Sequence, residues 1–245
     1  MDPDIAALEE KLALWRQIQT EGREKLILSD GDLTLDKIHR IGAMDISFLP
    51  ADPNLGFVTL TLSAFPSMIP YYQESRLMAI KEPYISGYLA FREAELCIHL
   101  YRSFLAASHT TGIAPPDILL LDGCGIYHER NYGLACHVGV ILEIPTIGVA
   151  KTPIILPGLE DIQQQCDTFW STHNVNIPMP IMGKNREFYG HAIRSQTSKK
   201  PNYVSAGHMI SPQLAVDIIY ITRNDPAFEP IKLSDKGGRL LCGCN

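Results

Sequence analysis

The N-terminal part of the chain changes from a helical pattern of apolar residues to strand-like patterns. Residues 5–20 carry apolar side chains at helical spacing and predict a packing helix. Residues 40–49 predict an apolar strand, and the alternation over 56–62 predicts a half-buried strand. A third strand over about 69–80 would complete a meander of antiparallel pairs.

The middle of the chain alternates between helices and strands. We expect helices over about 87–107 and about 132–143. The apolar run 117–122 predicts a strand that helices bury on both faces, and 146–150 predicts the strand that completes a β-α-β unit. This order of elements indicates an α/β fold with a mixed central β-sheet flanked by helices.

The remaining elements extend the same predicted domain, which spans residues 1–245. A helix is expected over about 211–221, because it opens with a serine N-cap followed by proline. Residues 152–185 are rich in Gln, Asn and Pro and predict a peripheral insertion. We expect a flexible tail over about 236–245, with Cys242 and Cys244 in it as reduced thiols and not as a metal site.

Composition is that of a globular protein, with 46% hydrophobic and 20% charged residues. No apolar run approaches the ~20 residues that span a bilayer, and the acidic N-terminus is unlike a secretory or transit signal. We expect a monomeric cytoplasmic protein, with the nucleus as a second location, and no membrane partner.

The net charge of −6 argues mildly against a nucleic-acid partner. Basic residues nevertheless gather at Lys184, Arg186, Arg194, Lys199 and Lys200. Two interpretations stay open for this cluster, a phosphate-binding surface and a solvated loop.

Three acidic residues stand in apolar surroundings. Asp45 interrupts a strand, and Asp122 ends the buried strand at the carboxyl edge, where α/β sheets bind ligands. Glu93 lies between Leu89 and Leu96 on the apolar stripe of the long helix, so it is expected to point into the core.

Buried carboxylates are unfavourable unless a partner compensates their charge. Each of the three could pair separately with an arginine or cap a turn. For three acids from separate elements together we favour a shared divalent cation, Mg²⁺ with Mn²⁺ as a substitute, because oxygen ligands suit these ions. A pair of such ions serves mostly phosphoryl transfer.

Two longer motifs are similar to those of the endonuclease V family. Residues 83–93 read PYISGYLAFRE and resemble the family signature PY(V/I)(P/S)GxLxFRE. Residues 122–137 read DGCGIYHERNYGLACH and resemble DGxGxxHxRxxGxAxH. Shorter similar stretches lie at 148–151, 204–208 and 229–235, in the family's order.

The resemblance implies a ribonuclease-H-like fold and cleavage at the second phosphodiester bond 3′ of inosine or deoxyinosine, leaving 3′-hydroxyl and 5′-phosphate ends. It places Asp45, Glu93 and Asp122 at the family's metal-binding carboxylates, the same residues that burial singles out. Asp235 matches a fourth active-site position on resemblance alone.

The resemblance also implies a substrate-binding set. Tyr84 falls on the wedge motif, where an aromatic ring could fill the gap left by a flipped nucleotide; a core or surface tyrosine is the alternative. The other positions that match the wedge and the base pocket are Pro83, Ile85, Leu89, Gly123, Gly125 and Gly133. The glycines would let backbone amides approach a base edge, and they also suit turns.

Three further residues match the family's motifs, and each has two possible roles. Lys151 ends a buried strand and matches a lysine near the scissile phosphate, where it would stabilise transition-state charge; a snorkelling surface lysine is the alternative. His128 and His208 would either contact phosphate or form hydrogen bonds within the core.

Departures from the family pattern refine the expected substrate. Ser86 stands where many bacterial members have proline, and in this the chain is similar to the animal members, which act mainly on inosine in single-stranded RNA. We therefore expect an endoribonuclease for inosine-containing RNA, with deoxyinosine DNA as a further substrate. The alternatives are a catalytically silent inosine-RNA binding protein, a DNA-repair endonuclease for deoxyinosine, and a related nuclease without base preference.

Overall fold

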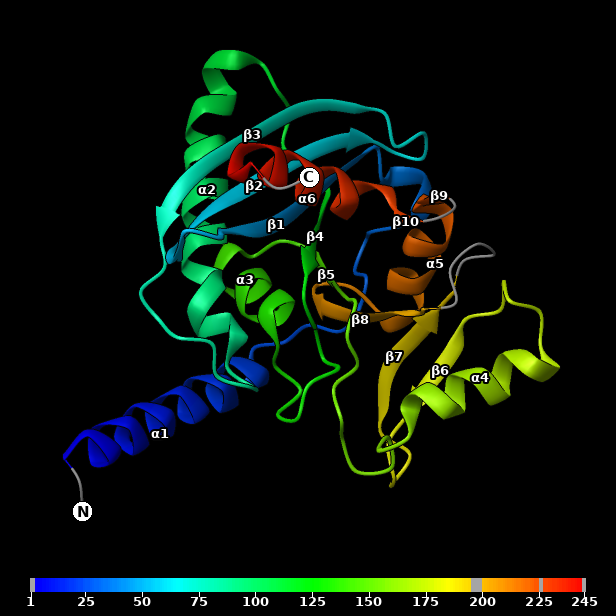
Figure 1. The fold of residues 1–245 in the computed structure, drawn as a ribbon. Helices are drawn as coiled ribbons and strands as arrows, with labels where there is room; N and C mark the ends of the chain where they lie inside the picture. The colour runs from blue at the N-terminus through cyan, green and yellow to red at the C-terminus, as the bar shows by residue number, and fades with distance from the viewer. Residues whose placement is uncertain (1–2, 195–199, 225–226, 244–245) are drawn as a thin grey trace.

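The computed structural model describes residues 3–194, 200–224 and 227–243, which form an eight-stranded sheet flanked by helices (Figure 1). The strands of this sheet are β1 (Arg40–Leu49), β2 (Asp52–Ala64), β3 (Pro70–Ala79), β4 (Ile118–Asp122), β5 (Thr146–Ala150), β6 (Met179–Met182), β7 (Phe188–Ile193) and β8 (Asn202–His208). A two-stranded ribbon joins β9 (Arg223–Asn224) and β10 (Ala227–Phe228).

The helices are α1 (Pro3–Glu24), α2 (Leu89–Thr111), α3 (Leu134–Leu142), α4 (Ile162–Thr172), α5 (Pro212–Thr222) and α6 (Glu229–Cys242), with a short 3₁₀ turn η1 (Leu35–Lys37). Within the residues that the structure describes, none of them is long and apolar enough to cross a membrane.

The sheet has the strand order β3-β2-β1-β4-β5-β8-β7-β6 and is mixed, as predicted. Strands β1, β2 and β3 form the expected antiparallel meander. Strand β4 runs parallel to both β1 and β5, whereas β8, β7 and β6 continue in antiparallel pairs. The carboxyl ends of β1, β4 and β5 therefore meet at one edge of the sheet.

Helices cover both faces of the central strands. On one face, α2 and α3 pack on alternate residues of β1, β2 and β4, including Met44, Leu60 and Leu121. On the other face, α5 packs on β8 and β7 while α6 packs on β1 and β4, and the intervening residues Ile41 and Leu120 belong to the core cluster on this face. This two-sided burial explains the continuous apolar run of β4.

Strand β2 is more buried than its alternating pattern indicates. The apolar positions face α2, but Thr59, Thr61 and Ser63 on the opposite face are also fully buried. Helix α6 lies across this part of the sheet (Figure 1). The Ser234 hydroxyl lies 2.9 Å from Thr61 Oγ1 and 3.0 Å from the Ala43 carbonyl oxygen. The expectation of a half-buried strand was wrong because a helix with a polar face covers the threonines.

The C-terminal segment differs from the expected tail over 236–245. Residues up to Cys242 continue α6, which packs closely on β1. A Cβ on Gly238 would lie 2.4 Å from Ser47 Oγ, and the Cys242 thiol contacts the Ser47 carbonyl oxygen at 3.4 Å. Glycine is thus required for this close approach of helix to sheet. Cys244 lies outside the described residues.

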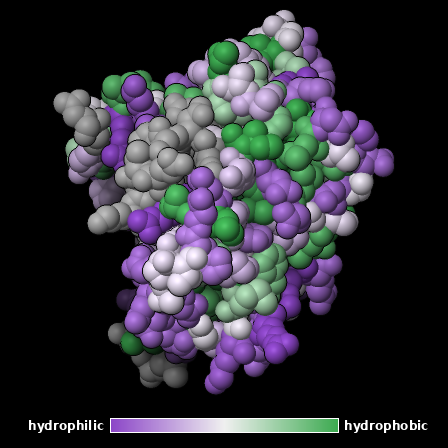
Figure 2. All heavy atoms as spheres, turned by 90° about the vertical axis from the view of Figure 1, so that its right-hand side faces the viewer, coloured by the Kyte–Doolittle hydropathy of each residue, from purple (hydrophilic) through white to green (hydrophobic). Residues whose placement is uncertain are grey.

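The segment 152–185 contributes α4 and β6, and β6 forms an outer strand of the same sheet. Figure 2 views the side of the molecule where α4, α5, β6 and β7 lie in Figure 1, and apolar groups are scattered there among hydrophilic ones. The Arg194 guanidinium lies over the Trp170 ring at 5.8 Å, whereas Lys199 lies outside the described residues. A phosphate-binding role for the basic cluster stays a prediction.

Replacing Ser234 tests the polar attachment of α6. Ser234→Ala removes the buried hydroxyl that contacts Ala43 and Thr61, so we expect the free energy of unfolding to fall by about 1–3 kcal/mol. Urea unfolding measures this change. Lys236→Ala, at an exposed position of the same helix, is the control and should lie within about 0.5 kcal/mol of the wild type. Equal stability of the two variants would contradict the attachment described here.

Candidate active site

Two of the predicted carboxylates lie side by side at the edge where β1 and β4 end. The parallel register pairs Met44 with Leu121, so the next residues, Asp45 and Asp122, are neighbours across the ladder. Asp45 is only 8% exposed. Because both strands are buried by helices, the chain positions these acids on rigid backbone.

Glu93 joins the same cluster from helix α2. It is 8% exposed, as the helical pattern predicted, and it lies close enough to Asp45 and Asp122 for their charges to act on it. Burial is the largest cause that raises the pKa of Glu93 to about 8, and the two aspartates add to it, while Arg92 opposes the shift.

The pKa of Asp45 is raised for the same reasons, burial and neighbouring negative charge. Burial raises the pKa of Asp45 to about 8, and a hydrogen bond with Asp122 and its negative charge contribute further. The charge of Asp235 acts in the same direction, whereas Lys151 opposes it. Asp45 and Glu93 thus both have raised pKa values, and the charge of Asp45 acts on Glu93, so a bound cation would relieve both.

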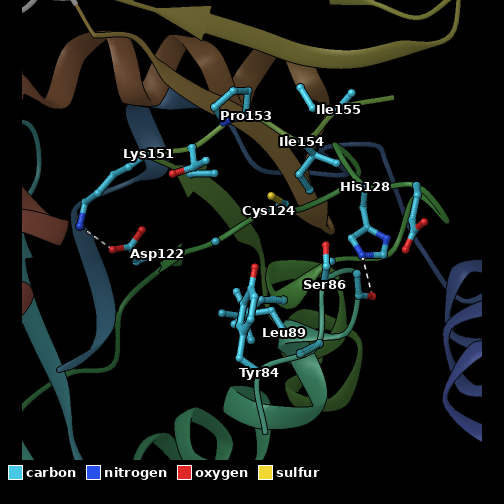
Figure 3. A pocket seen from close by; sticks show the side chains of 18 residues that line it. Tyr84, Ser86, Leu89, Asp122, Cys124, His128, Lys151, Pro153, Ile154 and Ile155 are labelled. Atoms are coloured by element: carbon cyan, nitrogen blue, oxygen red, sulfur yellow. Dashed lines mark hydrogen bonds and ion pairs between the residues drawn. The ribbon is translucent and has the colours of Figure 1, made fainter. Parts of the chain in front are cut away.

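Lys151 supplies positive charge to the cluster. Its Nζ lies 2.6 Å from Asp122 Oδ2 (Figure 3). Burial alone would lower the pKa of Lys151, but the charge of Asp122 and the hydrogen bond to it prevail and raise the pKa. The side chain is half exposed, yet it is directed at the carboxylates and is not simply a snorkelling surface lysine.

Asp235 reaches the cluster from the C-terminal helix. It lines a cavity of 340 Å³ together with Asp45, Asp122 and Lys151. Arg239, one helical turn further on, donates from Nε to Asp235 Oδ1 at 2.6 Å. The structure thus brings all five predicted catalytic residues into one region.

A larger cavity of 610 Å³ adjoins the carboxylates and shares Asp122 and Lys151 with the smaller one (Figure 3). Its remaining lining includes predicted substrate-binding residues, namely Tyr84, Leu89, Gly123, Gly133 and His128. Pro83, Ile85 and Gly125 are not part of this lining.

Tyr84 lies at the surface and not in the core. Its side chain is 68% exposed, although it also lines the larger cavity. Figure 3 shows the ring beside Leu89. The alternative of a core tyrosine is therefore wrong, and the ring is available to contact a ligand.

The three predicted glycines have their amides engaged within the protein. The amides of Gly123, Gly125 and Gly133 donate to Val149 O (3.2 Å), Ser205 Oγ (2.8 Å) and Gly125 O (3.0 Å) respectively. A Cβ on Gly125 would lie 2.0 Å from the Ala206 carbonyl oxygen. The structure thus gives these glycines roles in turns and close packing.

The two histidines form internal hydrogen bonds. His128 Nε2 lies 3.1 Å from Gly87 O, and its Nδ1 accepts from the Arg130 amide. Burial lowers the pKa of His128 to about 4, so the ring is neutral. His208 Nδ1 accepts from the Ile27 amide at 3.3 Å. The core interpretation fits His208, whereas His128 also lines the larger cavity.

Some cavity residues were not predicted from the sequence. Cys124, Ile154 and Ile155 line the larger cavity beside Lys151. Their position beyond the carboxyl ends of β4 and β5 was a usable signal, since ligands bind at that edge.

The donor chemistry of the cluster fits a hard divalent cation, since oxygen atoms from buried acids predominate. Among the described residues, however, no three His, Cys, Asp or Glu side chains are arranged as a complete metal-binding group. The acids are neighbours, and a shared cation stays a prediction.

Comparison with solved structures places the fold in a class. Endonuclease V from Ciona intestinalis, solved in complex with a 24mer DNA containing an inosine followed by a ribo-adenosine, superposes with a TM-score of 0.89 at 31% identity, covering 96% of this chain and 98% of that one. Human endonuclease V gives a TM-score of 0.85 at 29% identity, covering 95% and 98%. The class is the ribonuclease-H-like α/β fold, with acids at the edge of a mixed sheet.

Sequence comparison then identifies the family. The family model for endonuclease V matches residues 21–236. Mouse endonuclease V is 32% identical over 233 residues, covering 93% of this chain and 68% of the mouse protein. Human endonuclease V is 31% identical, covering 93% and 82%. The chain belongs to the endonuclease V family, and its relatives indicate a nuclease.

The raised pKa values predict a pH-dependent stability. Without divalent cations, the free energy of unfolding should fall as pH rises to about 8, because the folded pKa values of Asp45 and Glu93 lie above their ordinary 3.8 and 4.5. The stabilisation by the protonated forms is complete below the ordinary values and is lost as pH rises through about 8. Glu93→Gln should reduce this fall by at least about 1 kcal/mol.

Urea unfolding at a series of pH values measures the profile. Glu95→Gln, an exposed carboxylate on the same helix, serves as the control and should keep the wild-type profile. Parallel profiles for wild type and Glu93→Gln would show that Glu93 does not titrate in the buried cluster.

Proposed function

We propose that the protein is a metal-dependent endonuclease that cuts single-stranded RNA at the second phosphodiester bond 3′ of inosine, leaving 3′-hydroxyl and 5′-phosphate ends, with deoxyinosine DNA as a further substrate. The observation that carries the proposal is the shared wall of the two cavities. Asp122 and Lys151 line both the carboxylate cavity and the larger cavity beside it. A nucleotide held in the larger cavity would therefore present its backbone to the acids.

Asp45, Asp122, Glu93 and Asp235 are the residues that would hold Mg²⁺, or Mn²⁺ in its place. Their oxygen donors and their mutual repulsion support this assignment. When bound, the ion would supply an activated water and neutralise charge on the leaving oxygen. The protein's part is to hold the acids on β1, β4, α2 and α6 and to exclude water from the buried pair.

Lys151 stabilises the negative charge that develops on the scissile phosphate. Its present contact with Asp122, at the boundary of the two cavities, supports this role. The side chain is half exposed, so a short movement of Nζ from the carboxylate to a phosphate oxygen needs no change in the backbone.

The larger cavity receives the flipped hypoxanthine base. Its volume of 610 Å³ lies within the range of about 300–1,000 Å³ that is usual for small-ligand sites. Leu89, Ile154 and Ile155 supply apolar walls for a flat ring, and Tyr84 at the mouth fills the space left in the base stack. Because the glycine amides are already engaged, other polar groups of the lining must read the base edge.

Ser86 supports RNA as the preferred substrate. It lines the larger cavity beside Tyr84. Many bacterial members of the family have proline at this position, whereas this chain and the animal members do not. The Ciona relative was solved with DNA that carries an inosine, which supports nucleic acid as the substrate class. A silent binding protein would not need a cluster of buried acids, so cleavage is favoured over binding alone.

Matched oligonucleotides test the proposal. Wild-type protein with Mg²⁺ should cut single-stranded RNA that carries inosine, cut the matching deoxyinosine DNA less efficiently, and leave the adenosine strands intact. Asp45→Ala should reduce the rate by at least about a hundredfold while binding, measured by fluorescence anisotropy, persists. The reason is that Asp45 holds the reacting groups and does not line the base cavity.

Asp36→Ala, at an exposed acid away from both cavities, is the control and should cut at the wild-type rate. Undiminished cutting by Asp45→Ala would contradict the metal assignment. Equal cutting of inosine and adenosine strands would indicate a nuclease without base preference.

Tyr84→Ala tests the wedge assignment. The exposed ring makes little contribution to the core, so kcat/KM on the inosine strand should fall about tenfold while Tm stays near the wild-type value. Tyr71→Ala, another exposed tyrosine, is the control for loss of a surface ring. A lower Tm with unchanged kinetics would show that the ring serves stability.

A further inference from the structure

The carbonyl oxygen of Gly87 is contacted by three side chains that come from two distant parts of the chain. Gln19 Nε2 lies 3.1 Å from it, His128 Nε2 lies 3.1 Å from it, and Arg130 Nη2 lies 2.7 Å from it. Gly87 has a φ of +78° and comes three residues after Tyr84. This cluster therefore fixes the C-terminal end of the segment that carries the proposed wedge.

Gln19, like Arg130, belongs to this cluster and has no part in the proposed chemistry. It belongs to α1, which extends away from the rest of the domain (Figure 1), yet its side chain is fully buried. A buried amide is unfavourable unless both of its ends are satisfied. Here Nε2 donates to Gly87 O, and Oε1 accepts from Arg130 Nε at 2.5 Å. Gln19 also precedes the residues that the family model matches, 21–236.

Arg130 is held in place from several sides. Its guanidinium pairs with Glu129 at 2.7 Å and lies over the Tyr88 ring at 4.5 Å. A Cβ on Gly87 would lie 1.9 Å from Glu129 Oε1, so the two segments are already in close contact. The contacts join two neighbouring segments that line the larger cavity, the loop after β4 and the segment before α2 (Figure 3).

We propose that Gln19 is a positioning residue for the base site: with Arg130 it fixes the Gly87 carbonyl and so holds Tyr84 and Ser86 at the mouth of the larger cavity. The inference rests on the proposed function, because it assumes that a base enters this cavity. The acids lie beyond this cluster, at the strand ends. Loss of Gln19 should therefore affect how the base is held more than the cleavage step.

Gln19→Leu tests the inference, because leucine has a similar volume and removes all three hydrogen bonds of the amide, namely those to Gly87 O and Tyr132 O and the one from Arg130 Nε. We expect KM for the inosine-containing RNA strand to rise about tenfold while kcat stays within about threefold of the wild type. Gln17→Leu is the matched control, since Gln17 lies on the same helix and its side chain donates to Glu21 at an exposed site. It should show wild-type kinetics. Thermal unfolding of each variant sets an assay temperature well below Tm.

The outcomes separate the inference from the proposed function. A wild-type protein that does not distinguish inosine from adenosine overturns the proposed function. A selective wild type with an unchanged KM in Gln19→Leu, or with a loss confined to kcat, overturns the inference alone. Should Gln19→Leu not fold, Arg130→Lys takes its place, because one ammonium group replaces the fork that reaches both Gln19 and Gly87. It should show the same rise in KM, and a wild-type KM would contradict the inference.

Discussion

Mutual repulsion among buried acids is the constraint on which the rest of the site depends. Asp45 and Asp122 are neighbours because β1 and β4 run parallel and end at one edge, and Glu93 approaches them from α2. Burial and proximity raise the pKa values of Asp45 and Glu93 to about 8. Lys151 offsets part of the charge through Asp122. Natural cores avoid such a cluster unless it performs a function.

The C-terminal helix completes this arrangement from the opposite face of the sheet. Helix α6 lies on a surface of hydroxyl groups, with Ser234 against Thr61 and Gly238 against Ser47. Specific polar contacts fix its position, so Asp235 is delivered to the carboxylate cavity at one defined place. The polar face of β2 thus positions an active-site residue, and the wedge segment is positioned by a comparable polar cluster around Gly87.

Much of this could be predicted from the sequence where a local pattern decides the outcome. Apolar periodicity predicted the central strands, and the same reasoning singled out Asp45, Glu93 and Asp122 as misplaced charges. What could not be predicted depends on contacts between distant segments. The helix through Cys242 is stabilised by the sheet beneath it, and the burial of Gln19 depends on Arg130, far along the chain.

The proposal that the acids share a divalent cation is tested most directly by locating the ion. Crystals grown with Mn²⁺ and examined at the manganese absorption edge should show an anomalous peak within ligand distance of the carboxylate oxygens of Asp45 and Asp122. Lys151 should then have moved away from Asp122. A map at saturating Mn²⁺ that shows no peak at this edge, with the Lys151 ion pair still in place, would contradict the account.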